Sequence, residues 1–294
     1  MHQDTIKELT LADSAYPSLL REIAQPPKRL FYRGRLEALS VEPALAVVGT
    51  RRCSSYGKEA AHAIAFGLAR EGVAIVSGLA RGIDTAAHRA ALEVGGTTVA
   101  VLGSGVDEAS IYPRQNVGLA RAIIEAGGIV ISEYEPGAQA RAYTFPERNR
   151  IVAGLTQGTV VVESPLASGS RITARLALES NRNVYAVPGS IFSRLNEGSH
   201  ELIRQGALCV TSAEDVLRDI NPEYQPRQTS LTFEGTAEEQ AILKLIEEAD
   251  EALHVDKIIQ RTKLGAGEVA EALATLVLQD AIQEAGPNTY VVKK

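Results

Sequence analysis

Residues 46–52 read Ala46-Val47-Val48-Gly49-Thr50-Arg51-Arg52, an apolar run that ends in a glycine turn and two arginines. Short β-branched runs of the same kind recur along the chain, at 73–76, 97–102, 129–131, 159–162 and 183–187. Strands that are apolar on both faces are typical of a parallel sheet covered by helices on each side. The sequence therefore predicts an α/β fold with a doubly wound, mainly parallel sheet.

The segments between these runs have helical patterns. Helices are expected at 57–71, 84–93, 114–125 and 173–180, the third of them directly after Pro113. Each helix returns the chain to the start of another parallel strand, so we expect residues 41–220 to form one sheet domain. Residues 1–40 are expected to be an extended lead-in that packs on the edge of this sheet.

The C-terminal part of the chain has a different pattern. Residues 221–235 are polar and include Pro222 and Pro226, as expected of a linker. From 236 to 294 the pattern predicts three helices, at 237–249, 254–262 and 266–279, followed by a hairpin that turns at 286–288. Three helices followed by a β-hairpin are typical of a winged-helix domain.

Composition excludes several classes of protein. The 294 residues are 45% hydrophobic, and the formal net charge of -6 argues against a histone-like protein that binds nucleic acid through bulk charge. The sequence has no apolar run of about 18 residues and no signal peptide, so we expect a cytoplasmic protein without a membrane partner. Both cysteines are isolated and the five histidines lack ligand spacing. We therefore expect no metal, no disulfide and no cofactor.

The type of cation is more informative than the net charge. Between Val41 and Ile220 the only lysine is Lys58, whereas arginine occurs at 51, 52, 70, 81, 89, 114, 121, 141, 148, 150, 171, 175, 182, 194, 204 and 218. Arginine suits bidentate contacts with phosphate and stacking on bases. Most of these arginines are expected to cap helices or to pair with glutamates on solvated faces. Arginines in loops beside glycine are better candidates for a binding site.

The loop after the first parallel strand is the first candidate. It lacks the G-x-G-x-x-G pattern, so ordinary dinucleotide binding is disfavoured. Gly49 allows a tight turn, and Arg51 and Arg52 can project over the rim of the sheet. Ser54 is expected to cap the next helix, whose N–H groups would face an anion.

The loop after the second strand reads Ser77-Gly78-Leu79-Ala80-Arg81-Gly82. Two glycines flank one arginine, which makes Arg81 the functional candidate. Asp84 follows where a helix should begin, so we expect it to be the N-cap of that helix.

Residues 145–150 read Phe145-Pro146-Glu147-Arg148-Asn149-Arg150 before an apolar stretch. Pro146 is expected in the first turn of a helix, near Arg148 and Arg150. Two arginines near the positive end of a helix are unfavourable unless an anion binds there. Phe145 could stack on a base.

A fourth loop, after the fifth strand, contains Ser168-Gly169-Ser170 and is followed by Thr173. Its hydroxyls and N–H groups, at the start of a helix, suit a phosphate oxygen. Because the carboxyl ends of parallel strands meet at one rim, we expect the four loops to converge there on a polyanion. The binding candidates are Gly49, Arg51, Arg52, Ser54, Gly78, Arg81, Gly82, Phe145, Arg148, Asn149, Arg150, Ser168, Gly169, Ser170 and Thr173.

In combination these motifs resemble the DNA-processing protein A (DprA/Smf) family of bacterial recombination mediators. The resemblance runs from about Tyr16 to Leu217. Its motifs are the lead-in from Tyr16-Pro17 to Pro27, Gly49-Thr50-Arg51 with Tyr56-Gly57, Ser77-Gly78 with Ala80 to Asp84, Tyr112-Pro113, Phe145-Pro146 with Arg148 to Arg150, Ser168-Gly169-Ser170 with Thr173-Ala174, Pro188-Gly189, and Gly198-Ser199 with Leu202-Ile203 and Gly206-Ala207.

The resemblance implies an extended Rossmann-like fold that binds single-stranded DNA in a basic pocket, with Arg51 as a DNA contact. It also implies a homodimer that protects incoming DNA and helps load the RecA recombinase during natural transformation. Family members often begin with a small helical domain of the sterile-alpha-motif type. The residues before Tyr16 are too few for that domain, so we expect it to be absent.

Two other functions remain open from the residues alone. The chain could be a nucleotide phosphoribohydrolase of the lysine-decarboxylase-like group, since residues 168–173 are loosely similar to its phosphate loop. That chemistry needs an acid at the glycosidic bond, and Glu163 and Glu179 are the nearby candidates. A small-nucleotide sensor is the other alternative. No base, nucleophile or metal set has convincing spacing, so we expect no catalytic residues.

The charges of the winged-helix-like region lead to a prediction. Residues 236–294 contain six lysines and arginines against eleven acidic residues, and the expected recognition helix 266–279 carries Glu268 and Glu271 but no cation. A helix that reads the major groove normally brings cations or amides to the DNA. We expect residues 236–294 to contact protein rather than duplex DNA. Tight binding of duplex by this fragment at physiological salt, in a gel-shift assay, would contradict this.

Overall fold

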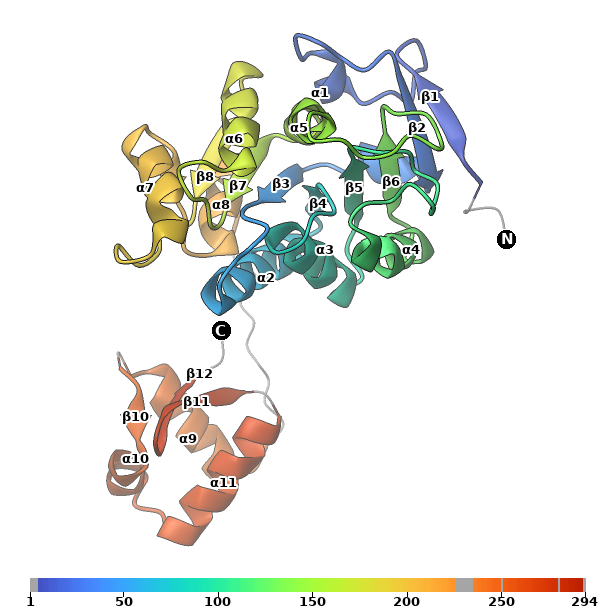
Figure 1. Ribbon diagram of the computed structural model, residues 1–294. Coiled ribbons are helices and arrows are strands. Elements are labelled where there is room, and N and C mark those ends of the chain that lie inside the picture. Colours follow the sequence, from blue (N-terminus) through green and yellow to red (C-terminus); the bar gives the residue numbers. More distant parts are fainter. Residues whose placement is uncertain (1–4, 226–234, 250, 280, 293–294) are drawn as a thin grey trace. The chain divides into compact units, whose positions relative to one another are not determined.

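The computed structural model describes residues 5–225, 235–249, 251–279 and 281–292 (Figure 1). The chain divides into two compact units, residues 1–225 and residues 226–294. Most of the linker predicted at 221–235 lies outside the described residues.

The first unit is built on a mostly parallel sheet. Within the described residues its strand order is β1-β2-β6-β5-β4-β3-β7-β8-β9. The strands are β1 (Lys7–Thr10), β2 (Arg29–Gly34), β3 (Ala44–Val48), β4 (Ala74–Ser77), β5 (Thr98–Leu102), β6 (Ile129–Ser132), β7 (Gly158–Val161), β8 (Asn183–Ala186) and β9 (Leu208–Cys209). Strands β3 to β9 pair in parallel, whereas β1 and β2 are antiparallel additions beyond β6. The predicted doubly wound α/β fold is confirmed.

Strand β3 lies at the point where the strand order reverses. It pairs with β4 on one side and with β7 on the other, so the chain builds the sheet outward from β3 in both directions. In open α/β sheets the crevice at the carboxyl ends of the strands, at such a switch point, is the usual place for a ligand.

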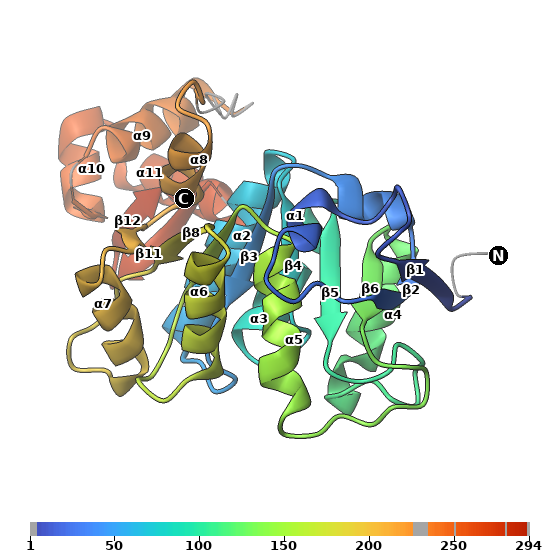
Figure 2. The same ribbon diagram turned by 90° about the horizontal axis from the view of Figure 1, so that it is seen from above.

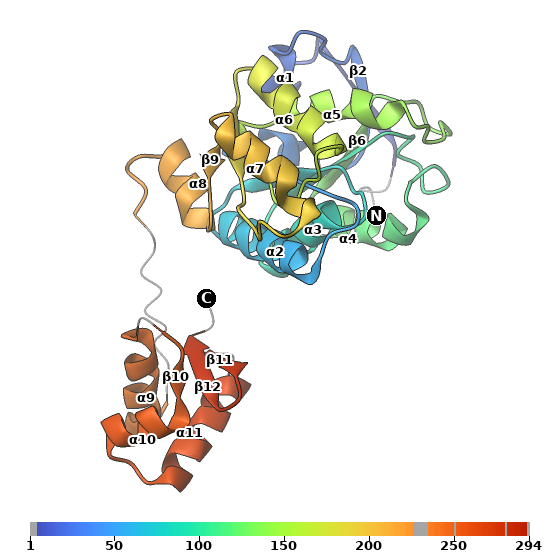
Figure 3. The same ribbon diagram turned by 60° about the vertical axis from the view of Figure 1, so that its left-hand side comes forward.

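Helices cover both faces of this sheet (Figures 1 and 3). One face carries α2 (Ser55–Arg70), α3 (Ile83–Glu93), α4 (Val117–Glu125) and α8 (Ala213–Ile220). The other carries α1 (Ser18–Arg21), α5 (Thr144–Gly154), α6 (Gly169–Glu179) and α7 (Glu197–Arg204), and α5, α6 and α7 can be followed across the near face of the sheet in Figure 2. Short 3-10 helices are η1 (Leu36–Ser40), η2 (Arg114–Asn116) and η3 (Arg194–Asn196). Helix α6 begins at Gly169, four residues earlier than predicted.

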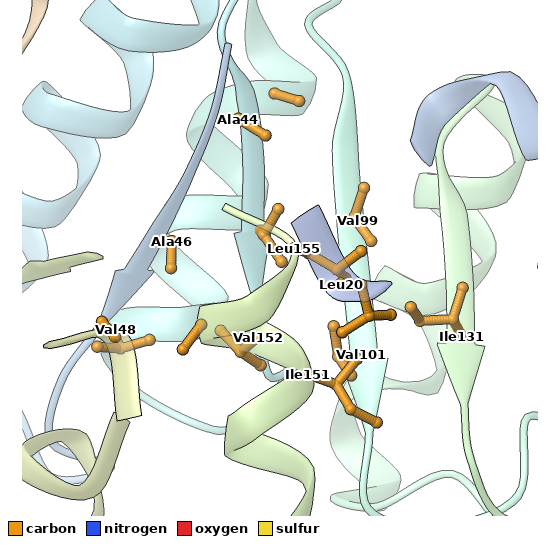
Figure 4. Close-up of a cluster of buried hydrophobic side chains, with 14 of the residues drawn as sticks. Leu20, Ala44, Ala46, Val48, Val99, Val101, Ile131, Ile151, Val152 and Leu155 are labelled. Carbon is orange, nitrogen blue, oxygen red and sulfur yellow. The ribbon is translucent and has the colours of Figure 1, made fainter. Parts of the chain in front are cut away.

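Successive side chains of a strand point to opposite faces of the sheet and pack into a hydrophobic core on each face. In β3, Leu45 and Val47 pack with α2 and α3, while Ala46 and Val48 face α5 and α6. Residues of the lead-in are part of the second core, because Leu20 of α1 is fully buried and lies near Ile151 and Val101 (Figure 4).

The second unit has a winged-helix arrangement. Its elements are α9 (Ala237–Glu247), β10 (Leu253–His254), α10 (Val255–Thr262), α11 (Ala266–Leu278), β11 (Ile282–Gly286) and β12 (Thr289–Val292). The strands pair in the order β10-β12-β11, and Ile242, Leu273 and Leu276 are among the residues of its own core. The exposed residues of α11 include Glu268, Glu271 and Leu278.

Helices of the described segments are all too short or too polar to cross a bilayer.

Replacement of Leu20 by alanine tests whether the lead-in belongs to the core. We expect Leu20→Ala to lower the free energy of unfolding by about 2–5 kcal/mol, because it removes a buried side chain and leaves a cavity. Urea denaturation measures this. Leu178→Ala is the matched control, since Leu178 is 61% exposed and should change stability by less than about 0.5 kcal/mol. Equal stability of the two variants would contradict the role of the lead-in.

Candidate functional site

A cleft of ≈ 830 Å³ opens at the carboxyl ends of the central strands. Most of its lining comes from the β3–α2, β4–α3, β6–α5 and β7–α6 connections and the helices that follow them, and Tyr112 of the β5–α4 connection and Leu195 of the β8–α7 connection also line it. It therefore lies at the switch point of the sheet, where the order of strands predicts a ligand site.

Most of the binding candidates predicted from the sequence line this cleft. They are Gly49, Arg51, Arg52, Gly78, Phe145, Arg148, Asn149, Ser168, Gly169, Ser170 and Thr173. Four candidates do not line it, namely Ser54, Arg81, Gly82 and Arg150. The cleft also includes Thr50, Tyr112 and Arg141, which the choice of candidates from the sequence left out.

The charge of the lining is strongly positive. Arg51, Arg52, Arg141 and Arg148 line the cleft, and among the described residues Asp84 is the only acidic residue that does so. This concentration of cations occurs in a chain whose formal net charge is -6. A local positive field in a cleft attracts anions despite the overall charge of the protein.

An arginine and two aromatic rings form one side of the cleft. The Arg51 guanidinium lies 4.5 Å from the centroid of the Phe145 ring. The centroid of the Tyr112 ring lies 5.7 Å from the Phe145 centroid, and the two rings are tilted relative to each other. Phe145 is half-buried and Tyr112 is exposed. The cation–π contact holds Arg51 in the lining, and Tyr112 adds an accessible ring.

Arg148 forms the floor of the cleft. Its side chain is buried, and its guanidinium donates a hydrogen bond to the Val101 carbonyl. A Cβ added at Gly78 would overlap the Arg148 guanidinium, so only glycine leaves room for this group. The Val101 carbonyl and the space at Gly78 thus accommodate Arg148, although it lies near the start of α5.

The buried carboxylate of Asp84 is the nearby counter-charge of Arg148. Burial raises the pKa of Asp84, and the nearby Arg148 opposes that shift. Burial likewise lowers the pKa of Arg148 to about 10, with Asp84 acting in the opposite direction. Arg148 therefore stays cationic at neutral pH.

The prediction that Asp84 caps its helix is wrong. Gly82, with φ of 78°, is the N-cap of α3, and the Asp84 carboxylate accepts hydrogen bonds from Gly78 N at 3.0 Å and Ala80 N at 3.3 Å. Asp84 lies in the first turn, and its side chain reaches back to the loop. It orders the β4–α3 loop that lines the cleft.

Ser54 caps α2 as predicted, accepting a hydrogen bond from Gly57 N at 3.0 Å. The anion at the start of α2 is a side chain of the protein itself, the carboxylate of Glu163. The buried Glu163 carboxylate accepts from Ser54 N at 2.9 Å and from Ser54 Oγ at 2.7 Å. Ser54 therefore connects α2 to the end of β7.

The three other candidates, Arg150, Gly82 and Arg81, lie outside the lining of the cleft. Arg150 donates to both carboxylate oxygens of Glu133 at 2.7 Å. Gly82 lies against the backbone of Thr50 and Arg51. Arg81 is exposed and borders a smaller hollow that shares Arg51, Tyr112 and Phe145 with the cleft.

The β7–α6 loop is held by its own hydroxyls. Ser168 is the N-cap of α6 and accepts from Ser170 N at 3.3 Å, and Ser170 Oγ donates to Ser164 Oγ at 2.9 Å. Asn149 Nδ2 donates to the Gly169 carbonyl at 3.3 Å, which connects α5 to the start of α6. Apart from Gly169 itself, its chain neighbours and the backbone of its own helix, no atom of the described residues lies within 4 Å of the position that a Cβ of Gly169 would occupy, so a ligand can approach this backbone.

The acids that a phosphoribohydrolase would need are not in the lining. Glu163 is buried against Ser54, and Glu179 pairs with Arg175 at 3.4 Å, at the other end of α6. No group of three or more His, Cys, Asp or Glu residues in the described segments could hold a metal ion.

The sequence matches two described families. Residues 7–221 match DNA recombination-mediator protein A, and residues 225–286 match the DprA winged helix domain. The chain is similar to DNA processing protein DprA of Streptococcus pneumoniae, with 48% identity over 210 residues, 71% of this chain and 73% of that protein. It is also similar to protein Smf of Escherichia coli, with 41% identity over 287 residues, 95% of this chain and 76% of that protein.

Two solved structures are similar to this fold. The X-ray structure of DprA from Streptococcus pneumoniae has a TM-score of 0.68 and 44% sequence identity, and the match covers 76% of each chain. DprA from Helicobacter pylori, whose structure concerns its single-stranded DNA binding mode, has a TM-score of 0.67 and 28% identity. That match covers 76% of this chain and 98% of the other.

Substitution of Gly78 tests the packing of the cleft floor. We expect Gly78→Ala to lower the free energy of unfolding by about 1–3 kcal/mol, because the enclosed Arg148 guanidinium has to move away from Asp84 and Val101. Chemical denaturation measures the change.

The control is Gly118→Ala in α4, where an added Cβ meets no atom of the described residues within 4 Å outside its chain neighbours and the backbone of its own helix. This variant should gain about 0.5–1 kcal/mol, since alanine favours a helix more than glycine does. The packing argument fails if Gly78→Ala is as stable as Gly118→Ala.

Proposed function

The chain belongs to the DNA recombination-mediator protein A family, and from this membership we propose that its cleft binds single-stranded DNA. The observation that carries the proposal is the convergence of four arginines on one cleft with accessible backbone, namely Arg51 and Arg52 of the β3–α2 loop, Arg141 of the β6–α5 loop and Arg148 of α5. The single-stranded DNA binding of the Helicobacter pylori relative supports it.

The polar and the aromatic groups of the lining would each contact a different part of a single strand of DNA. Guanidinium groups and the backbone around Gly169 and Ser170 would contact phosphates, as is common for anion sites at helix starts. Tyr112 and Phe145 would contact unstacked bases, which a duplex does not offer. Thus the cleft would favour single strands over duplex. Arg81, at the adjoining hollow, would act at its margin.

We further propose that the protein acts as a recombination mediator and not as an enzyme. In this role, a homodimer protects incoming single strands and helps load the RecA recombinase during natural transformation, in the cytoplasm. Family membership supports these partners. Residues 41–220 would bind the DNA, with residues 1–40 as the lead-in, and the domain at 236–294, joined by the linker 221–235, would contact protein.

Neither alternative function has comparable support. A phosphoribohydrolase needs a carboxyl group at the glycosidic bond, and Glu163 and Glu179 both have other partners outside the lining. Release of free base from nucleoside monophosphates would restore that alternative. A small-nucleotide sensor would be indicated if mononucleotides competed with oligonucleotides at similar concentrations.

Replacement of Arg51 tests the DNA site. We expect Arg51→Ala to weaken binding of an oligonucleotide about tenfold, because a charge-assisted phosphate contact is lost. The slope of log affinity against log salt should also fall by about 0.7, the contribution of one phosphate on a single strand. Fluorescence anisotropy across a salt series measures both quantities.

Arg175→Ala is the matched control for charge. Arg175 is an exposed arginine of α6 outside the cleft lining, paired with Glu179. It should leave both the affinity and the salt slope nearly unchanged. If Arg51→Ala behaves like Arg175→Ala, Arg51 is not part of the DNA site.

A further inference from the structure

The loop between β8 and α7 presents two large apolar side chains to solvent. Phe192 is 93% exposed and Ile191 is 79% exposed, and no large hydrophobic side chain in the described segments is more exposed than Phe192. A side chain so exposed contributes little to folding, because almost none of its apolar surface leaves water. Its position therefore calls for another explanation.

The loop is held in place by hydrogen bonds at both ends. At its start, Tyr56 Oη donates to the Pro188 carbonyl at 2.5 Å. Asn196 Nδ2 donates to the Ser190 carbonyl at 3.3 Å, and Gly198 N donates to the Ser164 carbonyl at 2.7 Å. Phe192 is thus displayed by an anchored loop, which is a suitable support for a contact residue.

This loop adjoins the DNA cleft through a second hollow of ≈ 600 Å³, lined mainly by Tyr56, Pro188, Ser190 and Ser193. Two short segments line both spaces. In the β3–α2 segment Arg52 lines the cleft and Ser54 the hollow, and in the β8–α7 segment Leu195 lines the cleft and Asn196 the hollow. The two spaces are therefore neighbours on one rim of the sheet.

The charges beside the loop suit an anionic partner. Arg194, two residues after Phe192, is exposed and has no ion pair within the described parts of the chain. Arg52 is exposed at the cleft side. Glu163 is the acidic residue at the hollow, and Ser54 already binds its buried carboxylate. An exposed aromatic ring beside an available arginine is the combination that single-strand binding sites use.

We propose that a single strand leaving the cleft crosses this hollow and stacks a base on Phe192. The inference depends on the proposed binding of single-stranded DNA in the cleft, and it extends that site toward β8. A linear polymer longer than the cleft must leave it along the rim. The hollow is one such path, and Phe192 lies in the loop between Ser190 and Ser193, which line the hollow. Continuity with the cleft favours DNA over a protein partner at this position.

A tryptophan reporter tests the contact in the full chain, since the sequence contains no tryptophan. Phe192→Trp would introduce a single indole whose fluorescence is quenched when a base stacks on it. Single-strand sites usually cover about 4–16 nucleotides, so an oligonucleotide of about 6 nucleotides is near the lower end of this range and one of about 20 exceeds its upper end. We expect the longer strand to quench the introduced indole and the shorter one to quench it much less. Leu178→Trp, at the far end of α6, should show no quenching with either strand.

Affinity provides the second measurement. Phe192→Ala should weaken binding of the longer strand about five- to tenfold, at the lower end of the range for one base stack, and leave the shorter strand unaffected. If Phe192→Ala leaves the longer strand unaffected while Arg51→Ala weakens both, the inference fails and the proposed function stands. A change in self-association without a change in DNA affinity also overturns it. Absence of single-strand binding by the unmodified protein rejects the proposed function itself.

Discussion

The cleft depends on one buried pair of opposite charges, Arg148 and Asp84. Burying a lone guanidinium would be prohibitively costly, and Asp84 on α3 supplies the compensating charge for Arg148 on α5. Arg148 donates a hydrogen bond to the Val101 carbonyl of β5, and Asp84 accepts one from Gly78 N of the β4–α3 loop. Elements from both faces of the sheet are thereby connected at the cleft, and Gly78 leaves the space that the Arg148 guanidinium occupies.

Topology explains why the lining comes from distant parts of the chain. Because β3 lies between β4 and β7, the loops that follow these three strands meet at one rim although more than a hundred residues separate the first from the last. The outer cations at this rim, Arg51, Arg52 and Arg141, are exposed, whereas Arg148 is fixed below them. The combination of a rigid floor and accessible cations suits a flexible anionic polymer, which can adapt to several contacts at once.

The sequence predicts the strands well because their apolar runs and the glycine turns after them are local signals. Side-chain direction is harder to predict. Arg148 and Arg150 are two positions apart on a helix, about 200° around its axis, so they face opposite sides, and Arg150 pairs with Glu133. Glu163 is the internal anion for Ser54, a contact across 109 residues that no local pattern reveals. Tyr112 reaches Phe145 through the same kind of long-range contact.

Hydrogen–deuterium exchange of the full chain, with and without a single-stranded oligonucleotide, tests the central claim most directly. If the separate crossovers form one receptor for a single strand, amides near 49–52, 78–81, 140–149 and 168–170 should gain protection together. Duplex of the same sequence should protect them much less. Protection confined to one of these loops, protection only in other parts of the chain, or equal protection by duplex would contradict the account.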